Sequence, residues 1–252
     1  MSMSRNWSAS AVGAMRGSPA PVTHTLIVLC CLVFLLGPAS GLNPAHGSGE
    51  ELLAAQRAYF RRWGVIPADL FDGSPGAALT PATALFVHGG WVHLLGNMLF
   101  LHVFGAMTEA RMGRVRFTVC YAGCGYLALL GYAAAHTDSG QPLVGASGAI
   151  SAVLGAFLFL FPRARVTSLL PFLFFLPVRF PAWVALPFWA ALQWAAAGQA
   201  ADGPEVAYLA HLVGFALGFG YAWLRFGRAA DVSRRGTAPG PPAARTPPAD
   251  RE

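Results

Sequence analysis

Polar residues interrupt an otherwise apolar chain at three places, and the first of these is the segment HGGWVHLLGN at 88–97. Gly89 and Gly90 favour the start of a helix, which places His93 in its first turn. Asn97 follows four residues later and therefore lies on the same face. Side chains of this kind can hydrogen-bond to neighbouring helices and hold a bundle together. Taken alone, the segment therefore predicts a packing role as readily as a chemical one.

The second segment is VGASGAISAVLG at 144–155, which we predict to begin a helix at Ser147. The free N–H groups and the dipole at a helix N-terminus favour negative charge. Such a charge develops on the substrate oxygen during acyl transfer, so Ser147 is a candidate nucleophile. The alternative is packing alone, because Ser147, Ser151 and Gly155 form a small face that lets another helix approach closely.

The third segment is AHLVGFALG at 210–218, in which His211, Gly214 and Gly218 share one helix face. The two glycines remove bulk beside the imidazole. If this face packs on the small face that carries Ser147, the hydroxyl and His211 come within hydrogen-bond reach. The alternative is a histidine that only makes a structural hydrogen bond.

The elements that position these residues are predicted to be membrane helices. Charged residues make up 11% of the sequence, against about 25% in soluble domains. Uncharged apolar runs approach the roughly 17–25 residues that a helix needs to cross the hydrocarbon layer. We expect an all-α membrane protein with a six-helix bundle at 22–228, preceded by a tail at 1–21 and followed by a disordered tail at 229–252. The expected spans are 22–42, 91–107, 117–135, 147–161, 182–197 and 206–223. An apolar segment at 166–178 contains two prolines and is expected to be a membrane-dipping connection.

Arginine sets the expected orientation, since the chain has no lysine. Arginines gather in both tails and in the second-to-third and fourth-to-fifth connections, which puts both termini in the cytoplasm. The net charge of +6 then reflects the orientation of the chain in the membrane, and nucleic-acid binding is not expected. The composition, rich in alanine, glycine and arginine, favours a bacterial plasma membrane.

In this orientation the polar residues share one depth. His93, Asn97, Ser147 and His211 all lie within about two turns of the outer ends of their helices. Peptide hydrolysis needs a nucleophile, a base, an oxyanion site and water, and each has a candidate at that depth. No carboxylate lies nearby in the spans, so we expect a Ser147–His211 dyad in which packing alone holds the imidazole.

The combined motifs resemble the rhomboid family of intramembrane serine proteases over about residues 80–225. The resemblance implies a catalytic Ser147 and His211, an oxyanion hole from Asn97, His93 and the Ser147 backbone N–H, and transmembrane protein substrates within the bilayer. It also places His88 near the hole and the fifth helix at a lateral gate. It implies no cofactor and no metal, and it leaves the substrate and the oligomeric state open. Ser151 departs from members that have an aromatic residue at this position. The matching motifs are His93-x-x-x-Asn97, Gly145-x-Ser147-Gly148, Ala210-His211-x-x-Gly214-x-x-x-Gly218, and the inner-loop residues Glu109, Arg111 and Gly113.

Other interpretations stay open at this stage. A non-catalytic rhomboid-like membrane chaperone could share the layout. A haem-binding electron carrier would use His88 and His102, although Gly89 and Gly90 leave His88 outside the helix. A zinc protease would need a motif such as H-E-x-x-H, which does not occur. The first apolar segment also resembles a cleavable signal peptide.

Overall fold

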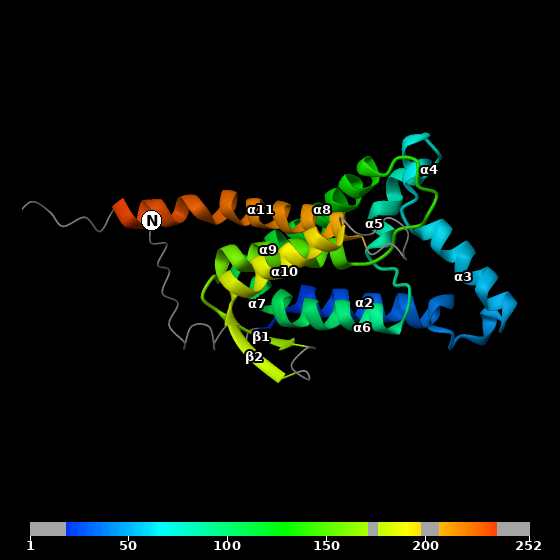
Figure 1. Cartoon of the computed structure of the whole chain (residues 1–252), viewed down its shortest axis with the longest axis horizontal. Coiled ribbons are helices and arrows are strands. Elements are labelled where there is room, and N and C mark those ends of the chain that lie inside the picture. The colour runs from blue at the N-terminus through cyan, green and yellow to red at the C-terminus, as the bar shows by residue number, and fades with distance from the viewer. Residues whose placement is uncertain (1–18, 171–175, 198–206, 236–252) are drawn as a thin grey trace, which may run out of the picture.

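A computed structural model describes residues 19–170, 176–197 and 207–235, and these are mostly helical (Figure 1). Of the expected tails at 1–21 and 229–252, residues 1–18 and 236–252 lie outside the described residues. The helices are α2 (Pro21–Leu36), α3 (Glu50–Trp63), α4 (Pro67–Phe71), α5 (Thr80–Ala84), α6 (Trp91–Phe100), α7 (Ala106–Met112), α8 (Arg114–Ala135), α9 (Ser147–Leu160), α10 (Ala182–Ala197) and α11 (Tyr208–Arg235). A π-helical segment, Leu101–Gly105, joins α6 to α7, and the strands are β1 (Arg165–Leu170) and β2 (Leu176–Pro181).

Three helical stretches are long and apolar enough to cross a membrane: Trp91–Met112, Arg114–Ala135 and Tyr208–Gly227. Three shorter apolar helices, α2, α9 and α10, coincide with the other expected spans. Two boundaries differ from the prediction. Helix α2 ends at Leu36, because Gly37 is extended and Pro38 has no N–H to continue the helix. Helix α11 continues to Arg235, beyond residue 228, where the bundle was expected to end.

The surface of the bundle is apolar. Val92 on α6 is 87% exposed and Trp194 on α10 is 73% exposed, while Thr108, Glu109 and Ser151 are buried. A soluble protein would expose the polar groups and cover most of these large apolar side chains. This inverted distribution, together with the long apolar helices, identifies an integral membrane protein.

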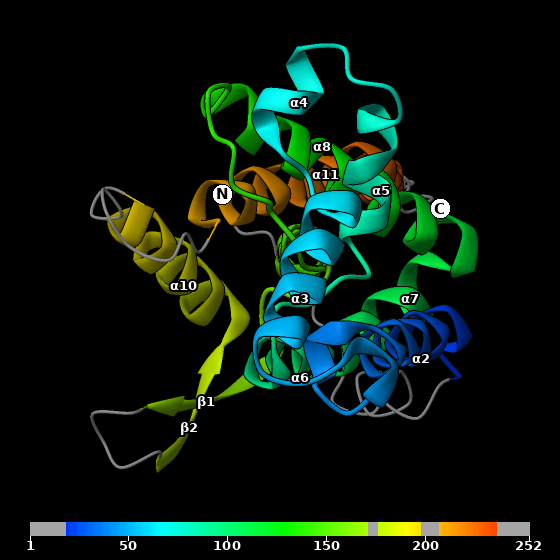
Figure 2. The same ribbon diagram turned by 90° about the vertical axis from the view of Figure 1, so that its right-hand side faces the viewer.

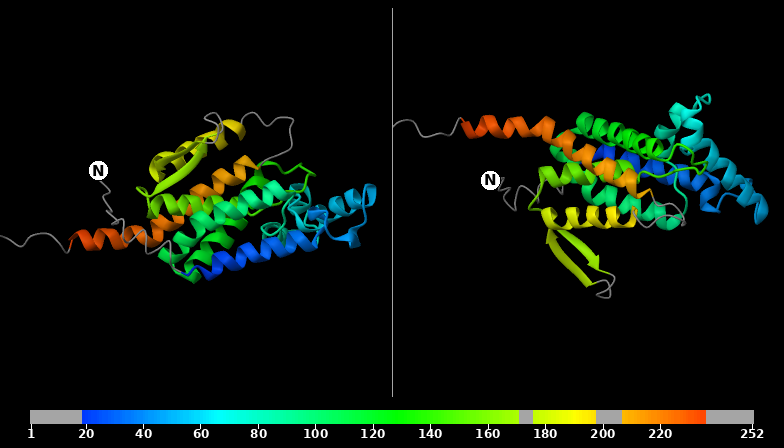
Figure 3. Two further views of the ribbon diagram at one scale, coloured as in Figure 1. Left: turned by 90° about the horizontal axis from the view of Figure 1, so that it is seen from below. Right: turned by 45° about the horizontal axis from the view of Figure 1, so that its top comes forward.

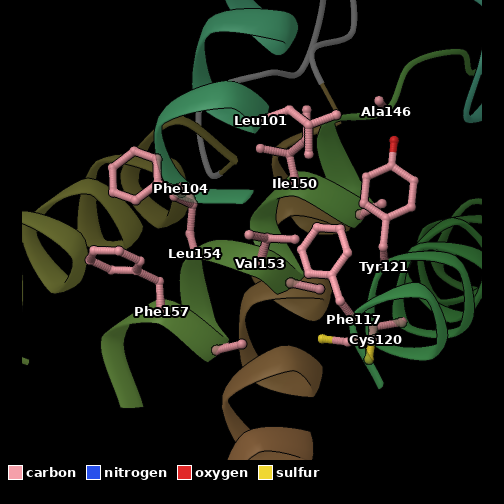
Figure 4. Close-up of a cluster of buried hydrophobic side chains, with 14 of the residues drawn as sticks. Leu101, Phe104, Phe117, Cys120, Tyr121, Ala146, Ile150, Val153, Leu154 and Phe157 are labelled. Atoms are coloured by element: carbon pink, nitrogen blue, oxygen red, sulfur yellow. The ribbon is translucent and has the colours of Figure 1, made fainter. Parts of the chain in front are cut away.

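Helix α9 forms the centre of the core. Almost every residue after Ser147 is buried, and α6, α8, α10 and α11 pack around it. Figure 4 shows Ile150, Val153 and Phe157 of α9 among side chains of α8 and of the π-helical segment. Because α9 is enclosed, its N-terminal residue is held at a fixed place between the surrounding helices.

Helices α9 and α11 approach so closely that their backbones touch. A Cβ atom at Gly214 would overlap the carbonyl oxygen of Gly148, and one at Gly218 would overlap that of Ala152. In the other direction, a Cβ atom at Gly155 would overlap the carbonyl oxygen of Phe215. Only glycine fits at these three positions, so the separation of the two helices is set by main-chain atoms.

The segment between α9 and α10, for which we expected a membrane-dipping connection without assigning secondary structure, contains two antiparallel strands that form a hairpin. Strand β1 pairs with β2 from Arg165 opposite Pro181 to Leu170 opposite Leu176. Val166, Thr167 and Val178 are β-branched and favour extended chain, and both strands are edges, which tolerate proline. Figures 2 and 3 show the hairpin projecting from the helical body beside α10. Its depth in the membrane stays a prediction.

A buried carboxylate joins α2 to the C-terminal end of the Trp91–Met112 stretch. Glu109 on α7 is 2% exposed. Its oxygens accept hydrogen bonds from the backbone N–H groups of Val22 (3.0 Å) and Thr23 (2.7 Å) and from the Thr23 hydroxyl (2.8 Å). The first N–H groups of a helix have no partner within the helix, so Glu109 satisfies the start of α2 from another element.

Replacing Glu109 with alanine is expected to destabilise the protein by about 3 kcal/mol or more, because three buried donors lose their acceptor. The measurement is the free energy of unfolding, obtained by titrating SDS into protein held in mild detergent. Glu50→Ala is the control, since Glu50 is exposed on α3 and should change stability by at most about 1 kcal/mol. Equal effects of the two substitutions would contradict this role for Glu109.

Candidate active site

Ser147 is the first residue of α9, and backbone hydrogen bonds tie the preceding loop to the segment between α3 and α6. Val65 and Leu143 exchange two backbone hydrogen bonds (2.9 and 2.7 Å), and Gly145 N–H donates to Ala84 carbonyl oxygen at 2.9 Å. Gly145 has φ +128°, a conformation that side chains other than glycine rarely adopt. The backbone N–H groups in the first turn of α9 therefore begin at a defined point, free of intrahelical partners.

His93 on α6 lies against this turn. A Cβ atom at Gly145 would lie 2.8 Å from His93 Nε2 and 3.7 Å from Ser147 Oγ, so the ring and the hydroxyl border the same small space. The Gly89 N–H donates to His93 Nδ1 at 3.3 Å. Because Nδ1 accepts, the proton of the neutral ring is on Nε2. His93 therefore presents a hydrogen-bond donor toward the space beside Ser147.

Asn97 lies one turn after His93 on α6. Its side chain is 9% exposed, and within the described residues its Nδ2 is buried without a hydrogen-bond partner. Buried amide groups are normally paired, because an unmet donor costs free energy. An unpaired donor here is a group that a substrate oxygen could satisfy.

His88 precedes α6 and is 1% exposed. Its Nδ1 lies 3.2 Å from the Phe86 carbonyl oxygen, and its ring centroid is 5.3 Å from that of His93. Burial, with a smaller contribution from a charge on His93, lowers the pKa of His88 to about 4. His88 is therefore uncharged at neutral pH, and His93 has a neutral imidazole as its neighbour.

His211 lies on α11, next to Ala210, which faces Gly148 of α9. Ser147 and His211 therefore occupy neighbouring levels on the two touching helices. Within the described part of the chain, their side chains are not joined by a hydrogen bond in this conformation. The Nδ1 of His211 instead lies 2.7 Å from Oε1 of Gln193 on α10.

Gln193 is a residue that the sequence interpretation missed. We expected packing alone to hold His211, and the structure supplies a polar partner. Because the amide oxygen only accepts, Nδ1 of His211 carries the proton and Nε2 keeps its lone pair. Trp189, one turn before Gln193, places its ring 6.2 Å from that of His211. The signal was present in the sequence, since Gln193 interrupts an otherwise apolar span, and polar residues there usually have a function.

Among the described residues, Ser151 makes no hydrogen bond to the imidazole of His211 and has no ring to stack on it. Its hydroxyl donates to the Ser147 carbonyl oxygen at 2.7 Å, and its Cβ faces Gly214. The aromatic neighbours of His211 come from elsewhere, Trp189 on α10 and Tyr208 on α11.

The site thus brings together a hydroxyl at a helix N-terminus and two imidazoles in opposite tautomers. His93 offers a donor at Nε2, and His211 offers an acceptor at the same atom. With the buried amide of Asn97, these groups can deprotonate a hydroxyl and stabilise an oxyanion.

Comparison with known proteins identifies the family. The model of the rhomboid domain matches residues 76–228. Over 82 residues the chain is 37% identical to "Putative rhomboid protease YdcA" of Bacillus subtilis, which covers 31% of this chain and 39% of the relative. Over 142 residues it is 39% identical to "Rhomboid protein 1, mitochondrial" of Saccharomyces cerevisiae, which covers 55% of this chain and 39% of the relative. The matches thus span about two fifths of each relative's length. The rhomboid domain covers more than half of this sequence and contains every residue of the site, and the chain belongs to the rhomboid family.

Proposed function

We propose that this protein is an intramembrane serine endopeptidase that cuts transmembrane segments of other membrane proteins, with Ser147 as nucleophile and His211 as base. The observation that carries the proposal is the pair of opposite tautomers beside the α9 N-terminus. The hydrogen bond from Gly89 leaves a proton on Nε2 of His93, and the bond to Gln193 leaves Nε2 of His211 free to accept one. One ring is suited to stabilise an oxyanion and the other to take the serine proton.

The first chemical step follows from these roles. Ser147 Oγ attacks the scissile carbonyl carbon, and its proton passes to Nε2 of His211. The carbonyl oxygen becomes an oxyanion as the C–O bond forms. Gln193 stabilises the resulting imidazolium, because it accepts a hydrogen bond from Nδ1.

The second step breaks the peptide bond. His211 returns the proton to the departing amine nitrogen as the C–N bond breaks, which leaves an ester on Ser147. A water molecule, deprotonated by His211, then attacks the ester carbon, and His211 returns this proton to Ser147 Oγ as the ester C–O bond breaks and the acid product is released. Because the site lies near one end of the helices, we propose that water enters from the outer side.

The oxyanion is proposed to bind Asn97 Nδ2, His93 Nε2–H and the Ser147 backbone N–H. Replacing Asn97 with alanine should lower the rate of cleavage by about 10²–10³, the usual cost of removing one such donor. The measurement is kcat/KM on a fluorescent transmembrane peptide in detergent. Met98→Ala, beside Asn97 and buried in the same helix, is the matched control for packing. If both variants lose rate equally, the loss at Asn97 is structural.

The membrane arrangement completes the proposal. The three shorter apolar helices would cross the bilayer with the three long ones, which gives six spans with both termini in the cytoplasm of a bacterial plasma membrane. The arginines of the connections support this orientation.

The test is reaction of the purified chain with a fluorophosphonate probe, which labels activated serines, together with cleavage of a transmembrane peptide that contains small and helix-breaking residues. Labelling and cleavage by the wild type, both lost in Ser147→Ala, are the expected result. A folded wild-type protein that neither reacts with the probe nor cuts the peptide would overturn the proposed endopeptidase activity and favour a rhomboid-like membrane chaperone.

A further inference from the structure

We infer that Gln193 is a positioning residue, which fixes His211 in the tautomer that can act as a base and makes that state depend on the packing of α10 against α11. The inference rests on the proposed function. It concerns the fifth apolar helix and not the residues that touch the substrate.

The contact itself is specific. Gln193 Oε1 and His211 Nδ1 are 2.7 Å apart, and both side chains are partly buried. The imidazole of a free histidine favours the proton on Nε2, which would leave Nε2 unable to accept from Ser147. A carbonyl acceptor at Nδ1 reverses this preference, because it is satisfied only when Nδ1 carries the proton.

The same helix also sets the direction of the ring. Trp189 lies one helical turn before Gln193, with its ring centroid 6.2 Å from that of His211 and 5.9 Å from that of Phe215. On the other side, Ser151 of α9 bonds to a backbone carbonyl and offers no ring to stack on. The orientation of His211 therefore depends on α10, together with Tyr208 of its own helix, whose ring centroid lies 6.4 Å away.

Helix α10 is the peripheral helix of the group. It lies at the edge of the bundle beside the hairpin (Figure 2), and its side chains Phe188, Leu192 and Trp194 are each more than half exposed. Pro187 lies inside it, where it removes one helical hydrogen bond and weakens the helix locally. A displacement of α10 would therefore separate Gln193 from His211 while leaving α9 and α11 in contact.

Other titratable groups near His211 do not replace Gln193. His93 faces it from α6 and Tyr208 from its own helix. Nδ1 of His93 is occupied by the Gly89 N–H. The pH at which His211 becomes able to act as a base should therefore depend on the side chain at position 193.

The experiment compares wild type, Gln193→Leu and Gln193→Glu in detergent. Gln193→Leu should label with the fluorophosphonate about 5–30-fold more slowly, the effect of one hydrogen bond on a rate. Gln193→Glu should keep the correct tautomer. Its carboxylate stabilises the imidazolium, so half-maximal labelling should move to higher pH by about 1–3 units. Gln56→Leu is the control, since Gln56 donates to the Pro38 carbonyl oxygen in the outer loop and should match the wild type.

A second readout does not depend on activity. In protein with ¹⁵N-labelled histidine, the His211 resonances are identified by their loss in His211→Ala. Wild type should show the proton on Nδ1, and Gln193→Leu should move it toward Nε2. An unchanged tautomer, rate and pH profile in Gln193→Leu would overturn the inference and leave the proposed function standing. An unreactive wild type would overturn the proposed function, and the tautomer would still decide the role of Gln193.

Discussion

Ser147→Ala and His211→Ala proteins should each cut a transmembrane peptide more slowly than wild type by a factor of about 10⁴ or more. In the proposed mechanism Ser147 supplies the attacking oxygen, and alanine has none. Without His211, the hydroxyl keeps its proton and is a poor nucleophile. The two residues act in one step, so the double variant should be no slower than either single variant. Cleavage is measured by gel or by fluorescence over long incubations.

The control is Ser151→Ala, which removes a buried serine hydroxyl from the same helix one turn further on. Its hydroxyl bonds only to the Ser147 carbonyl oxygen among the described residues, so the rate should stay within about tenfold of wild type. Near-normal cleavage by Ser147→Ala would show that another residue is the nucleophile. A loss in Ser151→Ala as large as that in Ser147→Ala would show that the region is merely sensitive to packing.

Gly218→Ala is expected to have the largest effect on folding, although it adds a single methyl group. The new Cβ atom would overlap the Ala152 carbonyl oxygen, and a backbone atom in a central helix cannot rotate away. The two helices must separate, and we expect a loss of about 3 kcal/mol or more. The rate of labelling by a fluorophosphonate should fall together with the stability, because Ser147 and His211 lie on the helices that move apart.

Gly220→Ala is the matched control, two residues further along the same helix. No atom lies within 4 Å of the position of its Cβ. Alanine is the better helix former, so this variant should be stabilised by up to about 1 kcal/mol. Both free energies come from SDS titration. Opposite signs for the two variants are expected, and a Gly218→Ala protein as stable as wild type would mean that the helices are not in backbone contact.

Much of the fold follows from local signals. Glycines before Trp91 and the Gly145–Ser147 turn predicted where α6 and α9 begin, and both helices start there. The hairpin was missed, because a short apolar run with two prolines does not distinguish a strand from an irregular connection. The end of α11 was also missed, since alanine and arginine at 229–235 are good helix formers that composition alone assigned to a tail.

The site was predictable only in part, for a physical reason. His93 and Asn97 share a face because they are four residues apart, and this is visible in the sequence. The partner of His211 comes from a different helix, 18 residues away in the chain, and no periodicity specifies which atoms meet. The tautomers of His93 and His211 are still harder to predict from the sequence, because they depend on hydrogen bonds that exist only once α6, α10 and α11 are packed.

The backbone contact between α9 and α11 divides the protein into parts that can and cannot vary. Side chains can be exchanged and repacked, but no substitution of a side chain shortens or lengthens a distance set by main-chain atoms. For the proposed endopeptidase, a library intended to change which sequences are cleaved should therefore leave Gly155, Gly214 and Gly218 untouched and randomise α10 and the segment between α2 and α6. Variants at the three glycines would misfold. Folded variants would therefore carry substitutions only in the randomised segments around them.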